Sequence, residues 1–488
     1  MKTIQQYLQD GGYNTVSDDT FSHIDEWLEW YQGEVEKFHK YKVFNGIKVT
    51  ECTRLSLGMA KKICEDWANL ILNEKVAIKA GSFDKRLQEI LKLNNFRVRA
   101  NQLIELAFAL GTGAFVEYLA GDAVVIDYVR ADMIYPLSWD NGDITECAFG
   151  SYRVQDGEDV IYLQIHRFGN QEDGESPEEY YIENRLVDAD SGKNLELGED
   201  ILPIVPTGST RPLFQIITPN IQNNIDLDSP MGISVYANSL SQLKGCDLVY
   251  DSYMNEFILG KKRIIVPVSM AKMMMGDEGI AAPVFDPNDT IYYAMPGDSK
   301  SDSLNLTENN MEIRAADHEL GIQRSLDLLS LKCGMGTGRY QFSSSGVKTA
   351  TEVISDKSDL YQNLKKNELP LASAIIGMVE ALAFLDGYGE VTVTVDFDDS
   401  IIEDSNTTID RNLKLVQGGL RSKLTAIMEI NKCSKTEAEK ELKLIAEEGQ
   451  ITGQEVDWTQ EDEEGDPEDA EDPSTEEDKA DEEAESEE

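Results

Sequence analysis

The stretch GMGTGRYQFSSSGVKTATEV, residues 334–353, holds residue types that could cradle a phosphate. A P-loop has the form GxxxxGK followed by Ser or Thr, and it joins a strand to a helix whose first amides face the anion. Here Val347 separates Gly346 from Lys348, and Gly338 lies too far upstream for a tight turn. The alternating GxGxG also lacks the third glycine of the dinucleotide-binding fingerprint. The spacing argues against a nucleotide site and favours a flexible loop between two helices, because glycine tolerates unusual backbone dihedrals.

Other residues with catalytic or metal-binding potential do not form a known pattern. The four histidines lie outside any HExxH motif, and the sequence has no GxSxG motif. Asp396, Asp398 and Asp399 could bind a hard cation through oxygen ligands, but without EF-hand spacing a solvated strand end is the favoured interpretation. Six cysteines without a CxxC pair predict buried thiols in a reducing compartment. We therefore expect no catalytic residue, no cofactor and no bound metal.

The charge of the chain is strongly negative and unevenly placed. The net charge is −47, and residues 455–488 hold 20 acidic residues and one lysine. Such a segment cannot collapse on itself, so we expect a disordered tail. The remaining body is also acidic and should repel nucleic acid except at local basic spots. The polar N-terminus lacks a secretory signal, and the longest apolar run, residues 374–385, is too short to span a bilayer. These features predict a soluble intracellular chain.

The elements that must position these residues are predicted from the spacing of apolar side chains. Helical spacing runs through residues 18–42, where the aromatic residues are expected in a core or a subunit contact. Further helices, strands and hairpins alternate along the chain, which predicts an α+β fold. The expected helices are 57–75, 84–93, 101–110, 235–259, 308–333, 348–385 with a kink at Pro370, and two short ones within 418–448; strands are expected at 76–80, throughout 114–215, at 261–267 and at 391–397.

Four blocks of sequence resemble the portal proteins of tailed double-stranded DNA phages, in the branch carried by phages and prophages of Gram-positive bacteria. Together and in this order they cover most of residues 50–450. The blocks are LIELAFALGTGAFVEY with VRADMIYPLSWDNGDI, MGISVYANSLSQLKGCDLVYDSYMNEFILGKKRIIVP, SSGVKTATEVISDKSDLYQNLKKNE, and GGLRSKLTAIMEINKCSKTEAEKELKLIAEE.

The resemblance implies a structural, non-enzymatic subunit of a ring, usually of twelve copies, at one capsid vertex. DNA enters the capsid during packaging and leaves it during ejection through such a ring. The subunit would have a β-rich wing, two long stem helices, a kinked linking helix, a helical crown and a disordered acidic C-terminal tail. The implied boundaries are 1–234 for the wing region, 235–333 for the stem, 334–347 for the tunnel loop, 348–407 for the kinked helix and returning strand, 408–454 for the crown and 455–488 for the tail.

The same resemblance gives a role to the glycine-bearing stretch. As a loop facing the channel it would contact passing DNA without sequence specificity, through Arg339, Gln341 and Lys348. The alternative for Lys348 is an ion pair with Glu352 one helical turn further on.

The resemblance also implies partners at the stem end and around the vertex. Lys261, Lys262 and Arg263 would either dock a terminase or cap the C-terminus of the preceding helix, where cations are favourable. The chain has no Walker motif, so the packaging motor would be a separate terminase. A major capsid or scaffolding protein and a head-completion or adaptor protein are further implied partners, and no membrane is. The ring would be assembled in the host cytoplasm and reside in the virion.

Two other classes of function stay open from the residues alone. An acidic scaffold or DNA-mimic protein would act through the tail, so deleting residues 455–488 would abolish its activity, whereas a portal would still assemble. A nucleotide-dependent enzyme is disfavoured by the broken glycine loop. Its activity would depend on Lys348.

Overall fold

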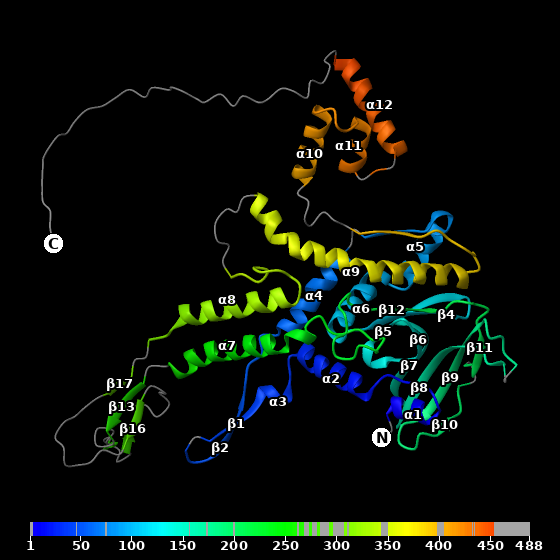
Figure 1. Cartoon of the computed structure of the whole chain (residues 1–488). Coiled ribbons are helices and arrows are strands. Elements are labelled where there is room, and N and C mark those ends of the chain that lie inside the picture. Colours follow the sequence, from blue (N-terminus) through cyan, green and yellow to red (C-terminus); the bar gives the residue numbers. More distant parts are fainter. Residues whose placement is uncertain are drawn as a thin grey trace, which may run out of the picture. The chain divides into compact units, whose positions relative to one another are not determined.

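The chain forms two compact units, residues 1–402 and residues 403–488, and each is described by itself. The first unit contains every described strand and nine of the described helices, α1 to α9, and the described part of the second unit is helical (Figure 1). The computed structural model describes residues 3–44, 46–73, 76–155, 157–171, 174–198, 201–260, 263–267, 273–275, 281–283, 292–295, 307–309, 312–342, 350–397, 405–431, 433 and 435–452.

The N-terminal segment is helical and then turns into a β-hairpin. Gly33 adopts a left-handed conformation with φ of 78° and ends the second helix, so the helix expected over residues 18–42 is shorter than predicted. Glycine allows this dihedral without the steric cost of a Cβ atom. The elements are α1 (Ile4–Asp10), α2 (Asp18–Gln32), α3 (Glu36–His39), β1 (Lys40–Phe44) and β2 (Val49–Thr53).

Three helices build the centre of the first unit. The expected apolar stripe of the first of them is confirmed, because Ile63, Cys64 and Trp67 are fully buried. The helices are α4 (Met59–Ile71), α5 (Asp84–Leu93) and α6 (Phe96–Leu110), with the short strand β3 (Ala77–Lys79) between the first two. The strand predicted at residues 76–80 and the helix predicted at residues 84–93 are also confirmed.

The β-rich region forms two antiparallel sheets. The order in the larger sheet is β10-β9-β8-β7-β6 with β11 also pairing β9, and in the smaller it is β12-β4-β5. Asn141 and Gly142 have φ of 51° and 91° and connect β6 to β7 in a two-residue turn, as predicted for an Asn-Gly pair. The strands are β4 (Gly113–Ala120), β5 (Ala123–Arg130), β6 (Ile134–Asp140), β7 (Asp143–Gln155), β8 (Glu158–Phe168), β9 (Tyr180–Asp188), β10 (Asn194–Leu195), β11 (Ile204–Pro206) and β12 (Phe214–Ile217).

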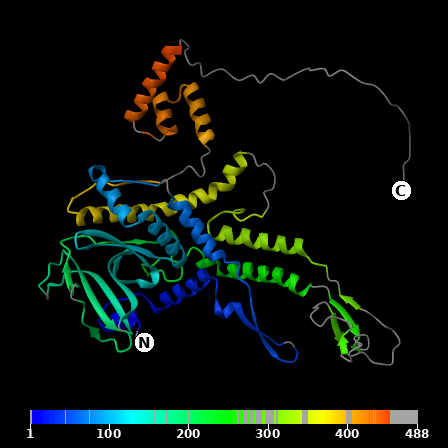
Figure 2. The ribbon, with the colours of Figure 1, turned by 180° about the vertical axis from the view of Figure 1, so that it is seen from behind.

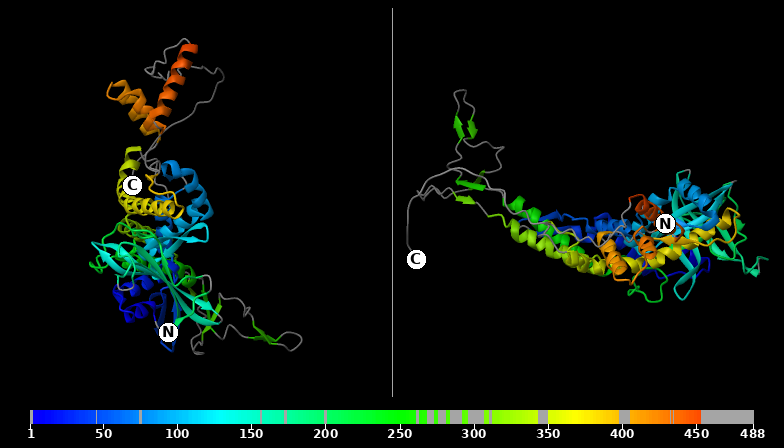
Figure 3. Two further views of the ribbon diagram at one scale, coloured as in Figure 1. Left: turned by 90° about the vertical axis from the view of Figure 1, so that its right-hand side faces the viewer. Right: turned by 90° about the horizontal axis from the view of Figure 1, so that it is seen from above.

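Two long helices, α7 (Leu240–Leu259) and α8 (Ala315–Lys332), lie side by side and extend away from the sheets (Figures 1 and 3). The second begins at Ala315 and not near residue 308, because residues 307–309 pair with a strand instead. Short strands lie between the helices in sequence: β13 (Arg263–Pro267), β14 (Met273–Met275), β15 (Ala281–Pro283), β16 (Tyr292–Met295) and β17 (Thr307–Asn309).

The longest helix, α9 (Ala350–Leu385), runs without a break through Pro370. Its segment Asp359–Leu385 is long and apolar enough to cross a membrane by length and composition, which the shorter apolar run considered above was not. Half of that window is buried within the protein, however. Ile375, Met378 and Val379 are fully buried in the main core, so the apolar character is that of a core helix. The strand β18 (Thr394–Asp396) follows and pairs with β3.

The second unit contains three described helices where the sequence predicted two. They are α10 (Ser405–Gln417), α11 (Lys423–Ile430) and α12 (Lys435–Thr452). Ala426 and Ala438 are buried between them, and Arg421 binds both Asn412 and Glu429. Glu437 lies in the first turn of α12, and Ser434 lies outside the described residues. The acidic tail from residue 455 onward also lies outside them.

Candidate functional site

The glycine-bearing stretch begins where α8 ends, and its backbone conformation requires the glycines. Gly334, Gly336 and Gly338 have φ of 78°, 76° and 78°. Residues with a Cβ atom adopt this left-handed region only at a cost, so the alternating GxG pattern specifies a compact turn at the end of the helix. Met335 between them is 3% exposed and belongs to the main core.

Hydrogen bonds hold the start of this loop against neighbouring helices. The Ser330 hydroxyl donates to the Gly336 carbonyl at 2.6 Å, and the Asn363 amide of α9 donates to the Gly334 carbonyl at 3.1 Å. Trp67 of α4 donates its indole N–H to the carbonyl of the residue before Gly334 at 3.1 Å. These bonds connect α8, α9 and α4 through the turn. The expectation of a flexible loop is therefore wrong for residues 334–342, while residues 343–349 lie outside the described part of the chain.

A buried carboxylate organises the next two residues. Asp66 on α4 accepts a hydrogen bond from the Tyr340 hydroxyl at 3.0 Å and an ion pair from Lys62 at 2.8 Å. The Arg339 guanidinium lies 3.8 Å from the same carboxylate, with its side chain 36% exposed. Burial and the adjacent Asp66 charge raise the pKa of Tyr340, so the phenol stays protonated and donates. Arg339 is thus partly neutralised by Asp66, while about a third of its side chain stays exposed.

The remaining two predicted loop contacts have different outcomes. Gln341 is exposed, and Phe342 beside it is 62% exposed. The backbone around them is tied to α8, because Gln323 donates to the Tyr340 carbonyl at 2.9 Å and accepts from the Phe342 amide at 3.3 Å. Lys348 lies outside the described residues. The structure therefore brings Arg339 and Gln341 together on one anchored segment.

The predicted stem-end cluster is only partly described. Lys261 and Lys262 lie outside the described residues, and Arg263 is the first residue of β13, where its backbone pairs with β17. Near the end of α7, the structure describes an ion pair of Glu256, which binds Arg314 at 2.9 Å and lies 3.5 Å from His318. The hydrogen bond from Arg314 lowers the pKa of Glu256 to about 2. This ion pair joins the distal ends of the two long helices.

Two acidic residues of α7 are buried, which the sequence did not reveal. Asp247 is 4% exposed; it lies 3.0 Å from Nε2 of His39 and accepts the backbone amide of Leu57 at 2.7 Å. One turn further on, Asp251 accepts the backbone amide of Leu55 at 3.0 Å. Asp247 and Asp251 are four residues apart and so share one helical face, but the backbone amides that donate to them are about 190 residues away in sequence. No local pattern could have identified those partners.

The outer face of α8 carries a row of exposed leucines. Its inner face, with Ile322, Leu326 and Leu329 buried, packs against α7. Leu320 and Leu328 are each 59% exposed and Leu331 is 50% exposed. These three leucines, hereafter the α8 leucine stripe, share one helical face because residues three, four, seven or eight apart align.

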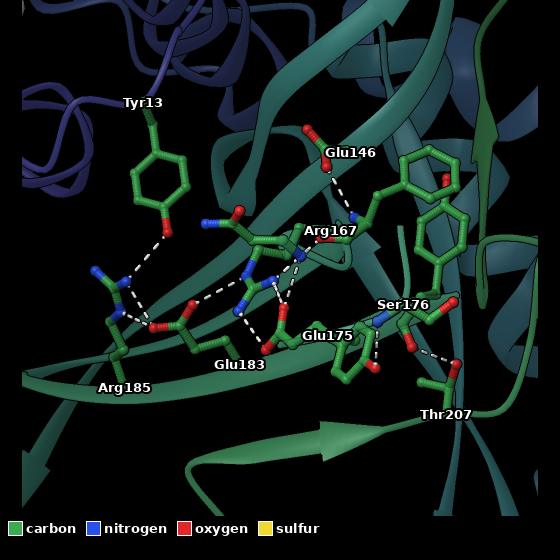
Figure 4. Close-up of polar contacts among 12 residues, drawn as sticks. Tyr13, Glu146, Arg167, Glu175, Ser176, Glu183, Arg185 and Thr207 are labelled. Atoms are coloured by element: carbon green, nitrogen blue, oxygen red, sulfur yellow. Dashed lines mark hydrogen bonds and ion pairs between the residues drawn. The ribbon is translucent and has the colours of Figure 1, made fainter. Parts of the chain in front are cut away.

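A dense polar cluster joins β8 and β9 to the N-terminal segment (Figure 4). Arg167 binds Glu175 through two bonds of 2.6 and 3.2 Å, and its Nε donates to Glu183 at 3.3 Å. Arg185 donates to Glu183 at 2.6 Å and to the Tyr13 hydroxyl at 3.1 Å. Hydrogen bonding to Arg167 lowers the pKa of Glu175. Each charge is balanced by its neighbours, so the cluster fastens the chain segments and leaves no group poised for proton transfer.

The comparison with protein families decides the identity. The family described as "Phage portal protein, SPP1 Gp6-like" matches residues 13–455. The chain belongs to this phage portal family. The resemblance carried by the four sequence blocks is therefore confirmed, and the α+β fold agrees with it. The protein is a structural component of a phage particle at the capsid, and its family is not one of enzymes.

The other two comparisons add little to this assignment. No curated protein matches the chain. Among solved structures, the portal protein is similar to a chain of the "Neck of native GTA particle computed with C12 symmetry", at 10% sequence identity and a TM-score of 0.39. The likeness covers 76% of this portal protein and 90% of that chain.

Two surface pockets of the portal protein differ in their position relative to the glycine turn. Within the described ranges, no group of three or more His, Cys, Asp and Glu residues is placed to hold a metal ion. A surface pocket of about 1060 Å³ lies between α4, β3, α5 and α6, away from the glycine turn. A smaller pocket of about 260 Å³ adjoins Gly334 and Gly336 and is bounded by α9. The features that bear on portal function are therefore the anchored loop and the exposed face of α8.

Proposed function

We propose that this portal protein assembles into a closed ring, usually of twelve copies, at one capsid vertex and forms the channel for double-stranded DNA. The observation that carries this proposal is the α8 leucine stripe. It lies on one of two long helices that extend beyond the sheets (Figure 3). An exposed apolar stripe on such a helix is stabilised when a neighbouring subunit covers it, and a repeated lateral contact that closes on itself makes a ring.

On this proposal, residues 334–347 face the channel. Arg339 and Gln341 are the described residues offered to DNA, and Lys348 is the third proposed contact. The nearby Asp66 reduces the attraction of Arg339 for phosphate, because the guanidinium already has a carboxylate at 3.8 Å. Weak contacts of this kind suit DNA in transit, since a strongly basic wall would hold a polymer that carries one charge per about 1.7 Å of axis. The acidic body supports the same view.

We infer the division of labour along the chain from the family and from the elements. Residues 1–234 would form the wing region, 235–333 the stem, 348–407 the linking helix and returning strand, 408–454 the crown, and 455–488 an acidic tail. The terminase would dock at the stem end near Lys261, Lys262 and Arg263. A capsid or scaffolding protein and a head-completion protein would bind the same vertex, and assembly would take place in the host cytoplasm.

Sedimentation velocity of the purified chain tests the ring. The double variant Leu320→Asp/Leu328→Asp places two charges in the stripe, and we expect it to sediment as a monomer at concentrations where the unchanged protein forms one large species. The matched control is Leu227→Asp, which changes a leucine that is 73% exposed on a loop. Removal of residues 455–488 should leave the large species intact. A protein that sediments only as a monomer at high concentration would contradict the proposal.

A further inference from the structure

The β1–β2 hairpin has no role in the account above. It projects away from the helices that carry it (Figure 2). Its two strands are joined by five residue pairs from Lys40–Thr53 to Phe44–Val49. Near the tip, Val43 is 43% exposed, Phe44 66%, Ile47 89% and Val49 60%. A protruding ribbon thus ends in large apolar side chains.

A ribbon of this kind needs another surface. No other described strand pairs with β1 or β2, and eight of their ten residues are exposed while none is buried. An isolated two-stranded hairpin is at best marginally stable in water, and its open edges and apolar side chains favour association. The exposed tip therefore indicates a contact that forms outside the single chain.

The base of the hairpin, in contrast, is firmly held. Arg54 donates its guanidinium to the Phe38 carbonyl at 2.6 Å and its backbone amide to the His39 carbonyl at 2.8 Å. The His39 ring is 5% exposed and lies 3.0 Å from Asp247 of α7. These contacts give the arm a fixed direction relative to α7. A fixed arm loses less conformational freedom on binding than a mobile one.

The hairpin base and α8 lie on opposite sides of α7. On α7, Asp247 holds the hairpin base, whereas Val249 faces α8, where its side chain packs beside Gly321. Asp247 and Val249 are two positions apart, which is a rotation of about 200° around the helix axis, so their partners lie on opposite faces of α7. The order across this part of the unit is hairpin, α7 and then α8, the helix that carries the stripe. A head-to-tail repeat of the chain brings the hairpin of one copy to the α8 side of the next.

The charges are complementary in the same direction. Residues 37–54 contain five Lys or Arg and one Glu, in a chain whose net charge is −47. The N-terminal part of α8 and the residues before it expose Glu312, Asp317 and Glu319. A basic arm is therefore attracted to the acidic N-terminal part of α8 in another copy.

From this arrangement we propose that the β1–β2 hairpin is an intersubunit arm whose apolar tip docks on the α8 leucine stripe of a second copy of this chain. This inference rests on the proposed ring. It names a contact between each subunit and the next one in that ring. DNA fits the hairpin less well. The large side chains exposed at the end of the hairpin that would reach a partner are apolar and offer phosphates no charge.

Photocrosslinking identifies the partner of the tip directly. A benzophenone amino acid replaces Phe44 in the full chain, copies are mixed with isotope-labelled chains, and the crosslinked peptides are mapped by mass spectrometry. We expect crosslinks between copies that fall within residues 312–332. Rings with crosslinks only within one chain, to another face of the second copy, or to added DNA overturn the arm proposal and leave the portal proposal standing. A protein that forms no ring overturns both.

Two variants measure how much the apolar hairpin tip contributes to self-association. Phe44→Asp/Val49→Asp puts charge at the tip, and we expect the self-association constant to fall by about tenfold or more. Phe44→Leu keeps an apolar tip and should associate within about threefold of the unchanged protein. Circular dichroism and the thermal midpoint of the monomer check that the first unit remains folded. Equal association of Phe44→Asp/Val49→Asp and the unchanged protein would overturn the arm.

Discussion

At the scale of single residues, Glu117 is the most unusual charge-bearing group of the first unit. It lies on β4, is fully buried, and neither of its carboxyl oxygens has a hydrogen-bond partner among the described residues. Burial raises its pKa from 4.5 to about 8, because the charged form loses its hydration. The side chain is therefore neutral in the folded protein at pH 7.

This burial predicts a pH dependence of stability. Between pH 4.5 and 8 the folded state keeps the proton of Glu117 and the unfolded state has lost it, so the free energy of unfolding falls as the pH rises through that window. The variant Glu117→Gln keeps the shape without the ionisation. We expect it to abolish most of this loss, which is on the order of 4 kcal/mol by pH 9. Denaturant unfolding at pH 5, 7 and 9 measures it.

His166 serves as the internal reference for that measurement. Burial lowers its pKa from 6.5 to about 3, so its contribution is lost as the pH falls below 6.5 and not as the pH rises. Loss of stability on the acid side should therefore persist in Glu117→Gln. An alkaline loss equal in Glu117→Gln and the unchanged protein would contradict the assignment to Glu117.

The Arg167 cluster gives a second prediction at this scale. The Arg167 side chain is 15% exposed and holds two carboxylates. Replacing it by methionine in Arg167→Met leaves Glu175 without a counter-ion and Glu183 with Arg185 alone, and we expect a loss of about 3 kcal/mol in the free energy of unfolding. Arg130→Met is the matched control, because Arg130 pairs with Asp132 while 49% exposed and should cost under about 1 kcal/mol. Similar losses of unfolding free energy in the two variants would show that the Arg167 cluster stabilises the fold no more than an exposed ion pair does.

At the scale of elements, one glycine lets the backbones of distant segments touch, and a second one serves only a turn. A Cβ atom at Gly111, after α6, would lie 2.5 Å from the Gly232 carbonyl oxygen, and φ at Gly111 is 88°. Gly121, in the β4–β5 turn, also has a positive φ of 64° but nothing within 4 Å of its Cβ position. The first site therefore combines backbone strain with a clash, and the second has strain alone.

These two glycines predict different costs for the same substitution. Gly121→Ala should lower the free energy of unfolding by about 1 kcal/mol, the usual cost of a left-handed backbone for alanine. Gly111→Ala also forces α6 and the segment before α7 apart, so we expect a loss of about 4 kcal/mol or failure to accumulate as folded protein. Thermal unfolding of the two purified variants is the measurement. Equal midpoints would mean that the close approach of the two backbones is not required.

Local spacing predicted the elements whose stabilising contacts are local. The apolar stripe of α4, the boundaries of α5 and the β4–β5 hairpin all agree with periodicity and turn residues. It failed at β1, because the apolar spacing of residues 18–42 continues past Gly33 although the backbone there is left-handed. It also missed the start of α8, where pairing of residues 307–309 with β13 overrides helical propensity.

The candidate site was predictable in composition but not in contacts. Glycine content marked the turn after α8, and Arg339 and Gln341 do lie together on it. The partner of Arg339 is Asp66, 273 residues earlier, and the hydroxyl of Tyr340 shares that carboxylate. Such long-range pairs depend on how α4 meets α8, which no single window of sequence records. The same holds for the link from His39 to Asp247.

At the scale of the whole molecule, function depends on surfaces that a single chain leaves uncovered. The family fixes a structural role in the phage particle. The leucine stripe of α8 and the apolar tip of the β1–β2 hairpin are the two surfaces that would meet between copies. Each is acceptable on a monomer only at a cost in exposed apolar area, and both are covered together in a closed assembly.

Electron microscopy of the purified full-length chain tests the central claim most directly. Class averages of particles in negative stain should show closed rings with an open centre, of one dominant subunit number, and the same rings should form without residues 455–488. Particles of uniform monomer size at every concentration, or open filaments without a central hole, would contradict the account.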